Sequence, residues 1–204
     1  MAPSNSVRFM PTSDTALVVV DVQNDFCPGG ALAVPDGDQV VPVINGWVGL
    51  FEAVGAPIVY SQDWHPQGHV SFQEREGPWP PHCVQGTAGA SLVDGLTVVG
   101  PRVLKGFDLD VDAYSAFEGR VSSVEGSTDG PRLATWLRER GVRRLLVVGL
   151  ATDYCVAATA DDGLQAGFEI TVDAAAARPV DVVPGDGTRR LNELESRGAT
   201  ILNR

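Results

Sequence analysis

The chain contains a single lysine, Lys105, among its 15 lysine and arginine residues. An ammonium is a compact charge whose pKa shifts readily, so a lysine kept where arginine serves everywhere else suggests a chemical role. Lys105 ends an apolar, strand-like run, Asp21 ends another, and Cys155 follows a third by a short connection. A carboxylate, a cation and a thiol together are the parts of an activated cysteine nucleophile.

These three residues are expected to converge if their strands are neighbours in a parallel sheet. Cys155 should then lie in the first turn of a helix, where the helix N-terminus and Lys105 would lower the pKa of its thiol. Taken singly, Asp21 could brace a turn, Cys155 could be a small buried apolar residue, and Lys105 could be a solvated cation. Their joint placement at strand ends favours the nucleophile. Cys27 and Cys83 lack such a setting and are interpreted as structural residues or as residues lining the site.

A second group of polar residues lies in an irregular segment rich in glycine and proline, residues 63–96. It holds all three histidines of the chain, His65, His69 and His82. Asp63 and His65 are two positions apart, so on an extended stretch their side chains point the same way. A carboxylate with imidazoles suits zinc, iron or manganese at an open site. The alternative is that the histidines only bond the loop to the sheet, and whether His69 is a ligand or a supporting donor stays open.

The hydrophobic pattern predicts the elements that must position these groups. Short β-branched runs predict strands over 16–21, 57–62, 97–105, 143–150, 168–174 and 199–202. Segments with helical spacing predict helices over 38–55, 131–141, 155–167 and 187–198. Strands that alternate with helices indicate a doubly wound α/β fold with a six-stranded parallel sheet and helices on both faces. We predict one domain over 1–204 with an ordered core over 15–203, and a site beyond the carboxyl ends of the strands.

Composition excludes several classes of function. The net charge of −11 argues against a nucleic-acid partner, which requires a basic face. The apolar runs are too short to span a bilayer and no signal-peptide core is evident, so we expect a soluble, cytoplasmic protein that does not bind membranes. Three cysteines make a disulfide framework unexpected. A small-molecule substrate fits this composition, and a homo-oligomer stays possible.

Five ordered blocks between about Ala16 and Asp173 carry a family resemblance. They read VVVDVQNDFCPGGALAV, QDWHPQGHVSF, WPPHCVQGT, VLKGFD followed by DAYSAFEG, and VVGLATDYCVAATADDGLQAGF. Together they resemble the nicotinamidases, also called pyrazinamidases, of the isochorismatase-like cysteine hydrolase superfamily. The resemblance implies a six-stranded parallel α/β sheet.

The resemblance also implies a role for each matching residue. The catalytic triad falls on Asp21, Lys105 and Cys155. The metal ligands fall on Asp63, His65 and His82, with His69 where some members supply a further ligand. The aromatic walls of the substrate pocket fall on Phe26, Trp79 and Tyr114. A cis peptide is implied at Leu150–Ala151, with an oxyanion hole formed by the backbone N–H groups of Ala151 and Cys155.

The activity that the resemblance implies is deamidation of nicotinamide to nicotinate and ammonia through a cysteine thioester, in pyridine nucleotide biosynthesis by NAD salvage. Hydrolysis of pyrazinamide is implied as well. The expected cofactor is one divalent metal ion, with zinc ahead of iron or manganese. The alternatives are another hydrolase of the superfamily, acting on isochorismate or on a carbamoyl or ureido compound, and a non-catalytic metal-binding or scaffolding protein, since fold alone does not fix function.

Overall fold

The computed structural model describes residues 9–204, so residues 1–8 of the predicted domain lie outside the described residues. The strands are β1 (Thr15–Val20), β2 (Ile58–Asp63), β3 (Arg102–Lys105), β4 (Arg120–Ser122), β5 (Arg144–Leu150), β6 (Glu169–Arg178) and β7 (Thr200–Leu202). The α-helices are α1 (Val40–Ala53), α2 (Leu133–Arg138), α3 (Ala157–Gln165) and α4 (Asp186–Ser196). All four predicted helices are present, each shorter than its predicted range.

The strands form one sheet in the order β4-β3-β2-β1-β5-β6-β7, parallel except for β4. The predicted α/β class is confirmed, but the predicted count of six strands is one too low. The missed strand, β4, is a three-residue edge strand antiparallel to β3. Its sequence, Arg-Val-Ser, is too short to show an alternating pattern.

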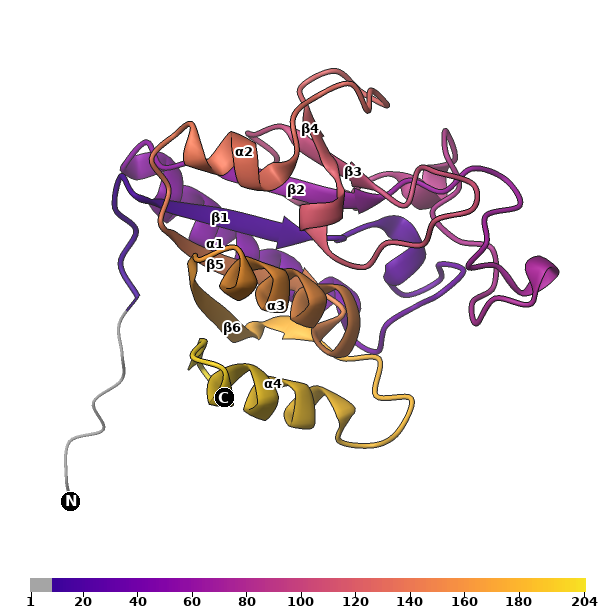
Figure 1. The fold of residues 1–204 in the computed structure, drawn as a ribbon. Helices are drawn as coiled ribbons and strands as arrows, with labels where there is room; N and C mark the ends of the chain where they lie inside the picture. The colour runs from indigo at the N-terminus through magenta and orange to yellow at the C-terminus, as the bar shows by residue number, and fades with distance from the viewer. Residues whose placement is uncertain (1–8) are drawn as a thin grey trace.

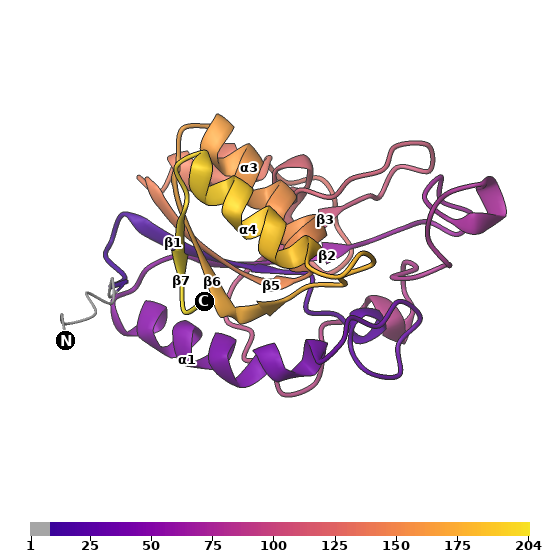
Figure 2. The same cartoon turned by 90° about the horizontal axis from the view of Figure 1, so that it is seen from below.

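Helices cover both faces of the sheet, with α1 on one face and α3 and α4 on the other (Figures 1 and 2). The strands are buried on both faces, so β1 is apolar throughout. Ala16, Val18 and Val20 join the core under α2, α3 and α4, whereas Leu17 and Val19 join the core under α1. The carboxyl ends of the parallel strands therefore meet at one edge, beyond which the long irregular segments lie (Figure 1).

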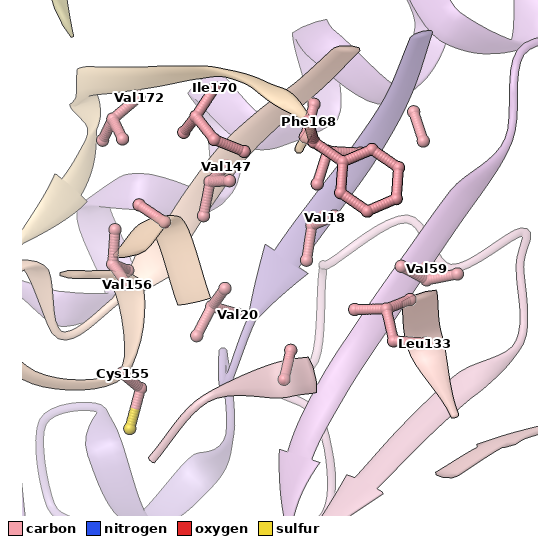
Figure 3. Close-up of a cluster of buried hydrophobic side chains, with 14 of the residues drawn as sticks. Val18, Val20, Val59, Leu133, Val147, Cys155, Val156, Phe168, Ile170 and Val172 are labelled. Carbon is pink, nitrogen blue, oxygen red and sulfur yellow. The ribbon is translucent and has the colours of Figure 1, made fainter. Parts of the chain in front are cut away.

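Cys155 lies at the margin of the first of these two cores. Figure 3 shows it beyond Val20 and Val156, with its sulfur directed away from the other labelled side chains. The remaining core side chains fill the space between the sheet and its helices. The predicted nucleophile, Cys155, therefore lies at the edge of the packed core, and its sulfur points away from that core.

Two predicted elements differ in detail from the structure. The strand predicted over 97–105 begins only at Arg102, since Gly100 and Pro101 precede it and proline has no N–H for a ladder. The helix predicted from residue 155 begins as a π-helical turn over Thr152–Val156 and continues as α3. Cys155 therefore sits in a widened turn, a form that often marks functional sites.

Within residues 9–204 we find no helix that is both long and apolar enough to cross a membrane.

Candidate active site

The structure brings Asp21, Lys105 and Cys155 together at the carboxyl edge of the sheet. Lys105 Nζ lies 2.9 Å from Asp21 Oδ2 and 3.5 Å from Cys155 Sγ. Strand β2 lies between β1, which precedes Asp21, and β3, which ends at Lys105. Its last residue, Asp63, pairs in register with Lys105 and contacts the ammonium through Oδ1. The ammonium is therefore shared by two carboxylates and a thiol.

Lys105 is fully buried at the centre of this cluster. Burial by itself would lower the pKa of its ammonium, but Asp21 and Asp63 hold that pKa well above its usual range. The lysine is consequently a permanent cation at neutral pH. A buried charge of this kind is tolerated because two anions neutralise it.

Asp21 has a backbone φ of 48°, in the left-handed region, directly after β1. Its Oδ1 accepts a hydrogen bond of 2.6 Å from the Ser61 hydroxyl. Complete burial raises the pKa of this carboxyl; Lys105 offsets that rise in part, whereas the negative charge of Asp63 adds to it. Asp21 is thus a carboxylate with heightened affinity for a proton, which is the property of a general base.

The expectation of a depressed pKa for the Cys155 thiol is wrong. Burial raises that pKa well above its usual value, and although Lys105 lowers it, the nearby carboxylates of Asp21 and Asp63 raise it further. Burial and the two nearby carboxylates therefore outweigh the single cation. This arrangement favours the protonated thiol and places Asp21 beside it as a proton acceptor.

Asp63 also faces two histidines. Its Oδ2 lies 3.7 Å from His65 Nε2 and 3.9 Å from His82 Nε2, and the ligand atoms of the three residues all lie within 4.8 Å of one another. Burial would raise the pKa of the Asp63 carboxyl, but Lys105 and His65 hold it well below its usual range. A permanently ionised carboxylate with two imidazoles fits a divalent metal ion.

The remaining ring nitrogens of these histidines support the same fit. His65 Nδ1 lies 2.9 Å from the Gly106 carbonyl and His82 Nδ1 lies 2.8 Å from the Pro80 carbonyl. Each Nδ1–H can donate to its carbonyl, so that Nε2, the nitrogen nearer to Asp63, is the one available to bind a metal ion. Gly106 is required here, because its φ is 60° and a Cβ would lie 2.5 Å from the His65 ring.

His69 is placed differently from the other two histidines. Its ring stacks on that of His65 with centroids 4.2 Å apart, but Nδ1 lies 2.7 Å from Ser71 Oγ and Nε2 lies 3.1 Å from the Val111 carbonyl. With both nitrogens in these bonds, His69 stands outside the group of Asp63, His65 and His82. In this geometry it supports the His65 ring.

A narrow hollow opens from Cys155 between aromatic and apolar side chains. Its lining comprises Phe26, Leu32, Val34, Asp63, Trp79, His82, Tyr114, Ala151, Tyr154, Cys155 and Val180. All three aromatic residues proposed from sequence are among them. Trp79 Nε1 donates to Tyr114 Oη at 3.0 Å, which fixes two of the walls relative to each other. The hollow is thus lined by aromatic rings, by the Cys155 thiol and by two members of the Asp–His group, Asp63 and His82.

Ala151 borders this hollow at the end of β5. The peptide bond between Leu150 and Ala151 is cis, as the sequence resemblance implied. The backbone from Ala151 to Cys155 thus turns around the mouth of the hollow, next to the thiol.

Cys27 and Cys83 are both free and buried. Burial raises the pKa of the Cys27 thiol to about 11 and that of Cys83 well above its usual value. Neither thiol lies within hydrogen-bond distance of Lys105 in the described structure, which agrees with a structural interpretation.

Sequence reasoning missed several residues that support the site. Tyr154 forms a wall of the hollow, with its ring 5.1 Å from that of Trp79. Asp25 accepts a 2.7 Å hydrogen bond from Cys83 N–H, which ties the turn after β1 to the His82 segment. Gln23 bonds to the backbone of Asp63. All three lie in the same short sequence blocks as the predicted site residues, and this proximity is the signal by which they could have been found.

A roomier hollow of about 830 Å³ lies elsewhere, over β2, β3 and the segment after β4. Its lining includes Trp64, Arg102 and Glu125 but neither a histidine nor a cysteine. Size alone therefore does not locate the chemistry, and the smaller hollow at Cys155 is the candidate active site.

This chain is similar to known proteins over most of its length. The family model described as Isochorismatase domain matches residues 15–203. The nicotinamidase of Escherichia coli K12 is 39% identical over 203 residues, which cover 91% of this chain and 93% of that protein.

Two solved structures are similar over nearly their whole length. The pyrazinamidase of Pyrococcus horikoshii in complex with zinc has a TM-score of 0.82 and 46% identity, covering 94% of this chain and 99% of that one. The PnC1 protein of L. infantum in complex with nicotinate has a TM-score of 0.82 and 35% identity, covering 96% of both chains.

Proposed function

This chain belongs to the isochorismatase domain family, and we propose that it is a metal-dependent amidohydrolase that converts nicotinamide to nicotinate and ammonia. One observation carries the proposal: the aromatic hollow is bordered by the Cys155 thiol and by Asp63 and His82, which together with His65 form the group that could hold a metal ion. Relatives named as nicotinamidases, and similar structures that hold zinc or nicotinate, support it. Pyrazinamide, a ring carboxamide of similar size, is a second expected substrate.

The substrate ring would lie between Phe26 and Trp79. Both side chains border the hollow, and aromatic walls bind a flat heteroaromatic ring by stacking. Asp63, His65 and His82 would hold one divalent ion, zinc in our proposal with iron or manganese as alternatives. Such an ion would supply a Lewis-acid contact for the pyridine nitrogen. The carboxamide carbon would then face Cys155.

The first chemical step is attack of the thiol on the carboxamide carbon. Asp21 takes the thiol proton, for which its raised pKa suits it, and Lys105 stabilises the anionic sulfur as the C–S bond forms. The backbone N–H groups of Ala151 and Cys155 would donate to the oxyanion, an interaction worth about 3–4 kcal/mol per donor in other enzymes. Asp21 then returns the proton to the nitrogen as the C–N bond breaks, which releases ammonia and leaves a thioester.

The second step is hydrolysis of the thioester. Asp21 accepts a proton from water as the water oxygen attacks the thioester carbon, and the proton passes to the departing sulfur. Nicotinate leaves, and Asp21 and Cys155 return to their starting protonation states. Only substrate and water are consumed, so this cycle uses no nucleotide or redox cofactor.

The test is release of ammonia from nicotinamide by the purified protein, before and after removal of metal by a chelator. We expect ammonia and nicotinate in equal amounts, and loss of both on chelation. Parallel assays with isochorismate and with a ureido acid address the other hydrolases of the family. A metal-loaded protein that hydrolyses one of those compounds but leaves nicotinamide intact would overturn the proposal, as would a protein active on none of them.

A further inference from the structure

Gln23 holds the backbone of Asp63 at both polar groups. Its Oε1 accepts from Asp63 N–H at 2.8 Å, and its Nε2 donates to the Asp63 carbonyl at 2.9 Å. The same Nε2 donates to the Ala90 carbonyl at 2.9 Å. The Gln23 side chain is completely buried, so these bonds are not shared with solvent.

This pair of hydrogen bonds between Gln23 and Asp63, called here the Gln23 clamp, lies beyond the point where β1 stops pairing with β2. The register of β1 with β2 ends at Val19 and Tyr60, after which the chain turns at Asp21 and leaves the sheet. The last backbone bond from this side runs from Asp21 N–H to the Ser61 carbonyl. The side-chain amide of Gln23 then offers Asp63 one acceptor and one donor, as a neighbouring strand would.

The energetic consequence falls on Asp63. A buried backbone N–H or carbonyl without a partner is unfavourable, so loss of the amide would move the end of β2 toward other partners. The Asp63 carboxylate contacts Lys105 on one side and faces His65 and His82 on the other. A small rotation of this backbone would therefore change both contacts at once.

We propose that Gln23 is a positioning residue that fixes the Asp63 carboxylate between Lys105 and the metal ligands, and so sets metal affinity and turnover together. The inference rests on the proposed function for its link to turnover. Its link to metal affinity rests only on the geometry of Asp63, His65 and His82.

Gln62 provides a matched control. It too is a buried glutamine that donates to the Ala90 carbonyl, at 2.7 Å, and it lies directly before Asp63 in β2. Within residues 9–204, its recorded side-chain bond is to Ala90 and not to Asp63. Replacing either glutamine by methionine removes an amide of the same size from the same region. Only Gln23→Met also removes the hydrogen bonds to the backbone of Asp63.

The experiment compares Gln23→Met with Gln62→Met in three measurements: zinc affinity by competition with a chromogenic chelator, melting temperature without metal, and kcat and KM for ammonia release. We expect Gln23→Met to weaken zinc binding by about 10–100-fold, the range seen when the support of a metal ligand is lost. Its kcat at saturating zinc should also fall, because the Lys105 contact is disturbed. Gln62→Met should lower the melting temperature similarly yet change zinc affinity less than about threefold.

Equal zinc affinity in the two variants, measured where both are folded, would overturn the proposal. If Gln23→Met does not fold, Gln23→Asn takes its place, because an amide one methylene shorter cannot span both groups of Asp63. Wild-type protein that binds zinc but releases no ammonia would refute the proposed function while leaving the comparison of zinc affinities valid. Wild-type protein that binds no zinc would overturn the inference itself.

Discussion

Two carboxylates, Asp21 and Asp63, contact the Lys105 ammonium, and their surroundings shift their pKa values in opposite directions. Asp21 has the lysine and one hydroxyl as partners in a fully buried pocket, and its pKa is raised. Asp63 has the same lysine and two imidazoles, and its pKa is lowered. The difference shows how one cation can pair with both a proton acceptor and a permanent anion.

The comparison assigns separate work to the two sides. The Asp21 side, with Cys155, is suited to proton transfer and nucleophilic attack. The Asp63 side, with its histidines, is suited to holding a metal and so to orienting a substrate. Changes on the first side should abolish chemistry and spare metal binding, whereas changes on the second should weaken metal binding and lower turnover through loss of the metal.

The largest effect is expected for Cys155→Ala. Removal of the sulfur should lower kcat by at least about 10⁴-fold, because no other group can form the thioester. Zinc affinity, measured by chelator competition, should be unchanged. Cys27→Ala is the control: its thiol is also buried and should be dispensable for turnover. An inactive Cys27→Ala beside an active Cys155→Ala would reverse the assignment.

The next effect concerns the other side of Lys105. We expect His82→Ala to weaken zinc binding by more than about 100-fold, since a ligand is lost, and excess zinc should restore part of the activity. His69→Ala should weaken it by about tenfold or less, because both ring nitrogens of His69 face Ser71 and Val111. Metal analysis measures zinc binding in both variants. An equal loss of zinc affinity in His69→Ala and His82→Ala would show that His69 is a direct ligand.

Lys105→Arg tests the cation between the two sides. A wide, rigid guanidinium cannot replace an ammonium between two carboxylates and a thiol, so kcat/KM should fall at least about 100-fold, or ~3 kcal/mol. Alkylation of Cys155 by iodoacetamide at neutral pH should also slow. Arg189→Lys, the reverse exchange at a solvent-exposed ion pair, should leave turnover unchanged. Wild-type values of kcat/KM and of the alkylation rate in Lys105→Arg would show that the mechanism does not require the lysine.

A smaller effect is expected for Ser61→Ala. The Ser61 hydroxyl donates to Asp21 and lowers its pKa, so loss of this bond should raise that pKa further. Because the base form of Asp21 is the ionised one, the acid limb of the kcat/KM profile should move to higher pH, with a loss of about tenfold or less near neutrality. Ser71→Ala, whose hydroxyl bonds to His69, should leave that limb in place. A shift of equal size in both variants would disconnect Ser61 from the base.

Much of this arrangement could be predicted from the sequence because parallel strands deliver their last residues to one edge. Asp21, Asp63 and Lys105 end or follow three adjacent strands, and apolar runs mark each of those strands. The three-residue strand β4 carried too little pattern to be found. The sequence predicted that residues 63–96 form a long irregular segment, but it did not predict how that segment packs over the site.

The acid strengths could not be predicted from spacing. The thiol of Cys155 was expected to be acidic because the sequence placed it at a helix N-terminus beside one cation. In the structure its burial raises the pKa, and Asp63 lies beside it as well as Asp21. That result depends on β2 lying between β1 and β3, a matter of topology. The clamp by Gln23 was hidden for a similar reason, since side-chain bonds to the backbone leave no periodic signal.

The most direct test of the account compares Asp21→Asn with Asp63→Asn, measuring zinc content and ammonia release from nicotinamide in the same preparations. Asparagine keeps the size of each side chain and removes its charge. The account predicts that Asp21→Asn retains wild-type zinc with turnover reduced at least about 10³-fold, because only the proton acceptor is lost. Asp63→Asn should lose zinc, with turnover falling in proportion. Loss of zinc in Asp21→Asn, or full zinc in Asp63→Asn, would contradict the division of labour across Lys105.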